Sequence, residues 1–202
     1  MRIPRRLGLT LAALALLGAT GATLLPEPAS PLRALTELSA QRLATADRVA
    51  AAKWIGGDPI DDPAREREVI RLARAEARRA GTDPDVVARV FRDQIDANKL
   101  VQRALHGRWQ ADPGTAPPAA GDGGNAGELS AVRAEIDRLN ADLLTELAEL
   151  AELTEATEGR AGADCPAQRG LALDETRDRR GLDPLHTRAL GHALRSVCPA
   201  AG

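Results

Sequence analysis

The sequence predicts an all-α protein in which about six helices form a single helical domain. Its 202 residues are 44% hydrophobic and 28% charged, a balance that supplies enough apolar side chains for one domain core. Strong helix formers such as alanine, leucine, arginine and glutamate dominate the chain. Aromatic residues make up 1% and tyrosine is absent, which argues against a β-sandwich, a base-stacking surface and an aromatic ligand cage. The formal net charge of -2 provides no basic field for nucleic acid.

Residues 1–22 are typical of an export signal peptide. Three arginines within the first six residues precede a short apolar run over Leu7–Leu17, and small residues at 19–22 offer a cleavage site. The run is short for a membrane span, although an uncleaved anchor remains the alternative. Cleavage predicts a mature protein that is secreted or periplasmic and has no stable membrane association.

The two cysteines, Cys165 and Cys198, agree with export, because an even number in an exported chain indicates a disulfide. Two buried free thiols are the alternative. A bridge would close the C-terminal pair of helices and add about 3 kcal/mol by restricting the unfolded chain.

Three helices are predicted in the N-terminal half, each opened by a capping residue followed by proline. The first begins at Ser30-Pro31, extends to about Trp54 and is stopped by Gly56-Gly57. The second spans about residues 63–80 and ends at Gly81. The third starts after Asp83 and reaches about Gly107, and its buried face consists of Val87, Val90, Phe91, Ile95 and Leu105.

The helical domain, residues 31–200, contains a Pro/Gly/Ala-rich segment at about 110–127 that predicts a flexible linker. Ser130 is predicted to cap a fourth helix, which ends by Gly159 or Gly162. A fifth helix is expected over about 167–180, and a sixth runs from Asp183-Pro184 to near Cys198. No strand candidate and no fixed-period repeat is present.

Four cations lie where local rules disfavour them. Arg42 and Lys53 fall in the apolar stripe of the first helix, at helical spacing from Leu35 and Val49. Arg65 and Arg133 fall in predicted first turns, where the helix dipole favours a bound anion over a cation. Each arginine alone is more often a snorkelling surface residue. Together the four indicate a site for a dianion, because buried cations need an anionic partner.

Two amides, Asn98 and Gln102, point inward from the third helix at a spacing of four residues. A satisfied amide pair between helices and a ligand-binding role are both compatible with this spacing. Asp62 is adequately explained as an N-cap, and Glu66 as a solvated acid of a first turn. The histidines show no metal-ligand spacing with the cysteines, so no metal site is predicted.

Four motifs are similar to those of a known family: QRLATADRVAAAKW at 41–54, PIDDPARERE at 59–68, VFRDQIDANKLVQ at 90–102 and LSAVRAEIDRLN at 129–140. With the cysteine pair, their order and spacing resemble the exported chorismate mutases of the all-helical AroQ type, gamma subclass, over nearly all of the mature chain. The resemblance implies a chorismate mutase type II-like fold.

The resemblance also implies an activity, the Claisen rearrangement of chorismate to prephenate, with no covalent intermediate and no cofactor. The substrate has two carboxylates and an ether oxygen that gains negative charge as its C–O bond breaks. Four residues stand at positions that contact substrate carboxylates in the family: Arg42, Arg65, Asn98 and Arg133.

The remaining matched positions act on other parts of the substrate. Lys53 and Gln102 would donate hydrogen bonds to the ether oxygen. Glu66 and Asp62 match positions that bind or support the ring hydroxyl. Some relatives have glutamate where this chain has Gln102, and since an amide donates at any pH, we expect activity that is flat across neutral pH. Val69 replaces a polar site residue of some relatives.

The resemblance places the whole site within one chain, so a homodimer is compatible with catalysis but is not needed for it. The rival interpretation is a non-catalytic exported helical protein that binds small dicarboxylates. The third interpretation is a helical adaptor with a purely structural role.

Overall fold

The computed structural model describes residues 31–118, 126–156 and 160–198, and every regular element in these ranges is a helix. The predicted all-α class is confirmed, whereas the predicted signal peptide lies outside the described residues. No helix in the described ranges is both long and apolar enough to cross a membrane. The elements are α1 (Pro31–Gly56), α2 (Pro63–Arg79), α3 (Pro84–Ala111), the short 3-10 helix η1 (Pro113–Thr115), α4 (Ala126–Ala156), α5 (Arg160–Arg180) and α6 (Pro184–Ala193).

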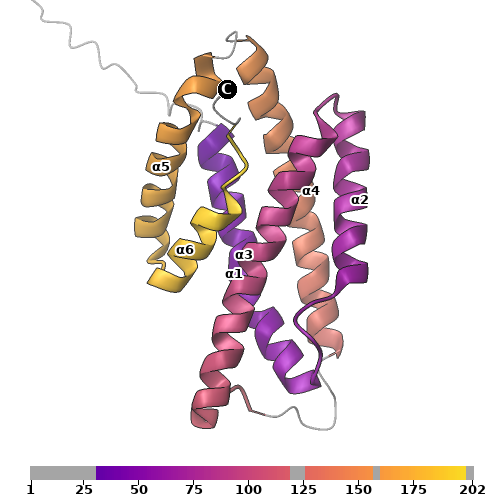
Figure 1. The fold of residues 1–202 in the computed structure, drawn as a ribbon, viewed down its shortest axis with the longest axis vertical. Helices are drawn as coiled ribbons and strands as arrows, with labels where there is room; N and C mark the ends of the chain where they lie inside the picture. Colours follow the sequence, from indigo (N-terminus) through magenta and orange to yellow (C-terminus); the bar gives the residue numbers. More distant parts are fainter. Residues whose placement is uncertain (1–30, 119–125, 157–159, 199–202) are drawn as a thin grey trace, which may run out of the picture.

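The long helix α1 is central, because it packs against α3, α4, α5 and α6 (Figure 1). Helix α2 covers α3 and α4 on one side of the molecule, while α5 and α6 cover the other side. One continuous core joins these layers. Its largest fully buried side chains come from four helices and include Leu35, Phe91, Leu143 and Leu190.

Three of the predicted capping residues lie at helix starts, whereas Ser30 lies outside the described residues. The side chains of Asp62, Asp83 and Asp183 accept hydrogen bonds from backbone N–H groups in the first turns of α2, α3 and α6. Gly57 and Gly81, predicted to stop α1 and α2, have φ angles of 68° and 72°. Only glycine adopts such angles without strain, so these residues end both helices as expected.

Two boundaries around the predicted linker at 110–127 differ from expectation. Helix α3 continues past Gly107 to Ala111, since Trp109 is buried and stacks edge-on against Trp54 at a centroid distance of 5.5 Å. Helix α4 already begins at Ala126, so Ser130 lies inside it and is not its N-cap. Glu128 in this added turn pairs with Arg48 of α1 at 3.0 Å. Residues 119–125 are outside the described ranges.

The C-terminal boundaries also differ. Helix α5 begins at residue 160 and not at 167, with Pro166 inside it, and α6 ends at Ala193 and not near Cys198. The early end of α6 follows from partners on α3. Gln94 donates to the carbonyl of Ala193, and the buried carboxylate of Asp93 accepts from Arg195 and from the backbone N–H of Ser196. These bonds replace those of a further helical turn.

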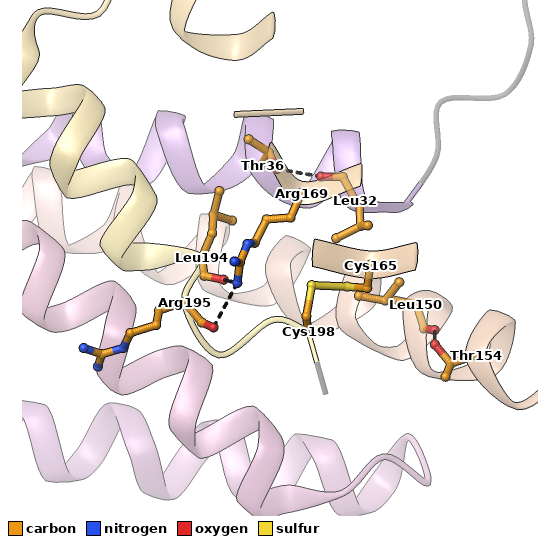
Figure 2. The surroundings of a disulfide bond; sticks show 9 residues. All are labelled: Leu32, Thr36, Leu150, Thr154, Cys165, Arg169, Leu194, Arg195 and Cys198. Carbon is orange, nitrogen blue, oxygen red and sulfur yellow. Dashed lines mark hydrogen bonds between the residues drawn. A yellow bond between two sulfur atoms is a disulfide. The ribbon is translucent and has the colours of Figure 1, made fainter. Parts of the chain in front are cut away.

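Cys165 and Cys198 form a disulfide that joins α5 to the end of the described chain (Figure 2), so this prediction is confirmed. The bridge packs in the core beside Leu32 of α1 and Leu150 of α4. Arg169 of α5 donates to the carbonyls of Leu194 and Arg195 and fixes the same segment. Covalent closure across 33 residues adds about 4 kcal/mol of stability by restricting the unfolded chain.

His186 joins α6 to α1 through two carboxylates. Its ring nitrogens lie 3.0 Å from Asp47 and 2.9 Å from Asp183, and the hydrogen bond to Asp47, opposed by burial and aided by Asp183, raises the pKa of His186 to about 9. Because this folded-state value exceeds the ordinary 6.5, the contribution to stability is complete below about pH 6.5 and disappears as the pH rises through 9.

We therefore expect the free energy of unfolding to fall between pH 6.5 and pH 9.5 by about 2 kcal/mol more in the wild type than in His186→Gln. Urea unfolding followed by circular dichroism across this range measures the difference. Parallel pH profiles of the two proteins would contradict the assignment.

Candidate active site

The two cations predicted to point inward from α1 are both buried. As whole residues, Arg42 and Lys53 are 4% and 7% exposed. Arg42 donates from Nε to Asn140 Oδ1 at 2.9 Å and from Nη1 to the carbonyl of Gln94 at 2.8 Å. Lys53 Nζ donates to the carbonyl of Ile60 at 2.6 Å. All these acceptors are neutral, and within the described residues neither cation forms an ion pair with a carboxylate.

Burial without a carboxylate partner has an electrostatic cost. Burial lowers the pKa of Arg42 to about 10, although the charge of nearby Asp137 opposes this shift. Burial also lowers the pKa of Lys53, with Asp62 opposing it. An anion placed between the two side chains would favour both charged forms and offset the cost. The pair is therefore suited to an anionic ligand.

The start of α2 and the facing side of α4 supply two further arginines. Arg65 lies in the first turn of α2, as predicted, and forms an ion pair with Asp137 of α4. Arg133 lies about two turns inside α4, so the expectation that it occupies a first turn is wrong. Its Nη2 donates to Asp62 Oδ2 at 3.1 Å. Both arginines thus have carboxylate partners, unlike Arg42 and Lys53.

The two amides of α3 bond to each other and to α1. Gln102 Nε2 donates to Asn98 Oδ1 at 2.6 Å, and Asn98 Nδ2 lies 3.4 Å from both the carbonyl of Arg42 and Thr45 Oγ1. Gln102 Oε1 is buried and has no hydrogen-bond partner among the described residues. The pair is therefore only partly satisfied within the protein, and a second N–H of Gln102 is also available.

One cavity between α1, α2, α3 and α4 is lined by all eight residues that the sequence singled out. Apolar side chains complete its wall, including that of Val69. The structure therefore brings the eight together, while their individual roles remain predictions. They are Arg42, Lys53, Asp62, Arg65, Glu66, Asn98, Gln102 and Arg133.

Lys99 also lines this cavity and was not predicted. Its Nζ lies 3.0 Å from Glu66 and 3.1 Å from Asp61, and although burial opposes the change, these hydrogen bonds raise the pKa of Lys99. Glu66 is thus an ion-paired acid and not the solvated one that the sequence also allowed. A signal was present, because Lys53 and Lys99 are the only lysines in the chain.

The arrangement is suited to binding and polarising an anion. It combines cations from four helices with amide donors and an apolar wall. No Ser/His/Asp arrangement was found in the sequence, and the described residues contain no cluster of His, Cys, Asp and Glu that could hold a metal ion.

Comparison with known proteins gives consistent matches. The sequence model of the family chorismate mutase type II matches residues 33–103. The chain is 40% identical over 188 residues to a secreted chorismate mutase of Mycolicibacterium smegmatis, covering 93% of this chain and 96% of that protein. It is 35% identical over 171 residues to a secreted chorismate mutase of Mycobacterium tuberculosis, covering 85% and 80%.

Solved structures agree with the sequence matches. The chorismate mutase from Burkholderia thailandensis superposes with a TM-score of 0.72 at 34% identity, covering 84% of this chain and 99% of that one. The secreted chorismate mutase from Yersinia pestis has a TM-score of 0.60 at 22% identity, covering 81% and 94%, and shares the fold.

Proposed function

The chain belongs to the type II chorismate mutase family and is a secreted chorismate mutase, and we propose that the eight cavity-lining residues carry its reaction, the rearrangement of chorismate to prephenate. This reaction is intramolecular and involves no proton transfer. A rate acceleration of about a million corresponds to about 8 kcal/mol, which orientation and a few preorganised donors can supply. No cofactor enters the scheme.

The arginines orient the substrate by binding its two carboxylates. Arg42 would bind one carboxylate with the N–H groups that Asn140 and Gln94 leave available. Arg65 and Arg133 would bind the other carboxylate and share it with their present partners, Asp137 and Asp62. Two carboxylates held at fixed positions restrict chorismate to the compact conformer in which its reacting ends meet.

The ether oxygen is assigned to Lys53 and Gln102, and two acids are assigned to the ring hydroxyl. An ammonium group has three N–H donors, and the carbonyl of Ile60 uses only one of those on Lys53. Both side chains stabilise the charge that develops on the oxygen in the transition state. Glu66, which is held by Lys99, and Asp62 support the ring hydroxyl.

The burial of Arg42 and Lys53 without carboxylate partners carries this proposal, because an anionic ligand at this cavity would offset its electrostatic cost. The direct test is to follow loss of chorismate absorbance with the purified mature protein and to identify prephenate as the product. Tight binding of chorismate without turnover would favour the rival function, a non-catalytic binder of dicarboxylates. A folded protein that neither binds nor converts chorismate would contradict both.

Activity should be independent of pH between 6 and 8, since neither Lys53 nor Gln102 is expected to change its donor capacity there. Gln102→Glu should lose at least about tenfold in kcat at pH 7.5 and recover activity as the pH falls, because only a protonated carboxyl group can donate to the ether oxygen. Initial rates at saturating chorismate across pH 5–8 measure this. A steep wild-type loss between pH 6 and 8, or a flat profile for the variant, would exclude Gln102 as the donor.

Export fits the predicted signal peptide at residues 1–22, which we propose is cleaved near 21–22. We also propose that residues 31–200 form the catalytic unit as a single chain. All eight residues come from α1, α2, α3 and α4 of the same chain or from the loop between α1 and α2, so a homodimer is not required. N-terminal sequencing of the secreted protein tests the cleavage site.

A further inference from the structure

The side chain of Asn140 holds the guanidinium of Arg42, and the proposed mechanism gives Asn140 no role. It lies on α4, is 8% exposed, and accepts from Arg42 Nε at 2.9 Å. The carbonyl of Gln94 on α3 accepts from Nη1 of the same guanidinium at 2.8 Å. Two acceptors on two helices fix the plane of the group, and three of its five N–H donors have no hydrogen bond among the described residues.

The chemistry of these acceptors differs from that around Arg65. Along one face of α4, Asp137 gives a carboxylate to Arg65, whereas Asn140, three residues later, gives Arg42 a neutral amide. The Arg65 side chain is 33% exposed, while Arg42 is almost fully buried. The protein thus pairs the more exposed arginine with a carboxylate and gives the buried one no carboxylate in contact, which raises the electrostatic cost of the folded state.

We propose that Asn140 is a positioning residue for catalysis, whose neutral oxygen orients Arg42 without neutralising it, so that the full charge of Arg42 attracts a substrate carboxylate. A carboxylate at residue 140 would make an equally short contact but would compete with the substrate for the same cation. This inference rests on the proposed role of Arg42.

Asn140→Asp separates orientation from charge, since the two side chains have nearly the same shape. The Asp carboxylate keeps an acceptor beside Arg42 Nε and forms an internal ion pair. We expect KM for chorismate to rise at least tenfold while thermal stability stays equal or increases. Asn140→Ala loses the acceptor altogether, so we expect a smaller rise in KM, about fivefold, together with a lower melting temperature.

A merely structural role predicts the opposite order, in which the Asp variant resembles the wild type and the Ala variant is the more impaired. A KM within twofold of wild type for folded Asn140→Asp therefore overturns the proposal. Ala141→Asp is the matched control, because it adds the same charge to an exposed position of α4, and we expect its KM to be unchanged. If Asn140→Asp does not fold, an unchanged KM for Asn140→Ala overturns the proposal instead.

Failure of the role proposed for Asn140 can be distinguished from failure of the proposed function. If the wild type binds chorismate in calorimetry but does not convert it, the dissociation constant replaces KM in the same comparison and only the catalytic role fails. If Arg42→Met loses chorismate affinity while Asn140→Asp keeps it, the function stands and this inference fails. If Arg42→Met keeps full affinity, both fail.

Discussion

Lys53→Ala is expected to lower kcat for chorismate roughly 10²–10³-fold, the usual effect of removing one preorganised donor to a developing negative charge. The side chain is buried at the cavity, and the carbonyl of Ile60 holds its Nζ at 2.6 Å, so the ammonium group is already oriented before substrate binds. Since the donor acts mainly in the transition state, kcat should fall more than KM rises. Steady-state kinetics from chorismate absorbance measure both.

Lys53→Arg tests whether positive charge alone is sufficient at this position. It keeps the positive charge but replaces a compact ammonium with a planar fork, and we expect activity between that of wild type and Lys53→Ala. Circular dichroism of each variant excludes unfolding as the cause. Full activity in folded Lys53→Ala would remove Lys53 from the mechanism.

Helix starts and stops were largely predictable because they depend on local chemistry. Asp-Pro at a helix start and glycine at a helix stop act within one turn. The structure has the predicted Asp-Pro starts at α2, α3 and α6 and the predicted glycine stops after α1 and α2. The wrong predictions arose where contacts with residues far away in the sequence determine where a helix ends. The end of α6 is determined by Asp93 and Gln94 of α3, which no local pattern shows.

The same distinction applies to the cavity. Arg42 and Lys53 were found because a charge in an apolar stripe violates a local rule, and Asn98 and Gln102 because amides there violate it too. The pairing of Arg65 with Asp137 is a contact between helices and has no local signature. The family resemblance, and not the periodicity, supplied the substrate and the roles of these residues.

Asn140 was overlooked although it has the right spacing. Arg133, Ile136 and Asn140 follow each other at three and four residues, so they share one face of α4, and both Arg133 and Ile136 line the cavity. Asn140 also borders the apolar stripe that Ile136, Leu139 and Leu143 form on the same helix. A polar residue beside an apolar stripe is ordinarily a surface residue, so only the bond to Arg42 distinguishes this one.

Arg42→Met is expected to lower kcat/KM for chorismate roughly 10²–10³-fold, because two charge-assisted hydrogen bonds to a carboxylate contribute about 3–4 kcal/mol. The loss should appear chiefly in KM, since the carboxylate is bound in the ground state as well as in the transition state. Arg42→Lys should recover only part of it, because a single ammonium group cannot reproduce the planar fork. Unchanged kinetics in Arg42→Met would contradict the clamp.

Stability should respond differently from activity in the same variant. Removing a buried charge that has no carboxylate in contact favours the folded state, while Asn140 Oδ1 and the carbonyl of Gln94 lose their donor, a loss of about 1–3 kcal/mol. These effects oppose each other, so we expect the free energy of unfolding of Arg42→Met to stay within about 2 kcal/mol of wild type, measured by urea unfolding. A structural arginine would instead destabilise the protein on removal without a specific effect on substrate. An active-site cation is held at a cost to the fold, and that cost is offset when the dianion binds.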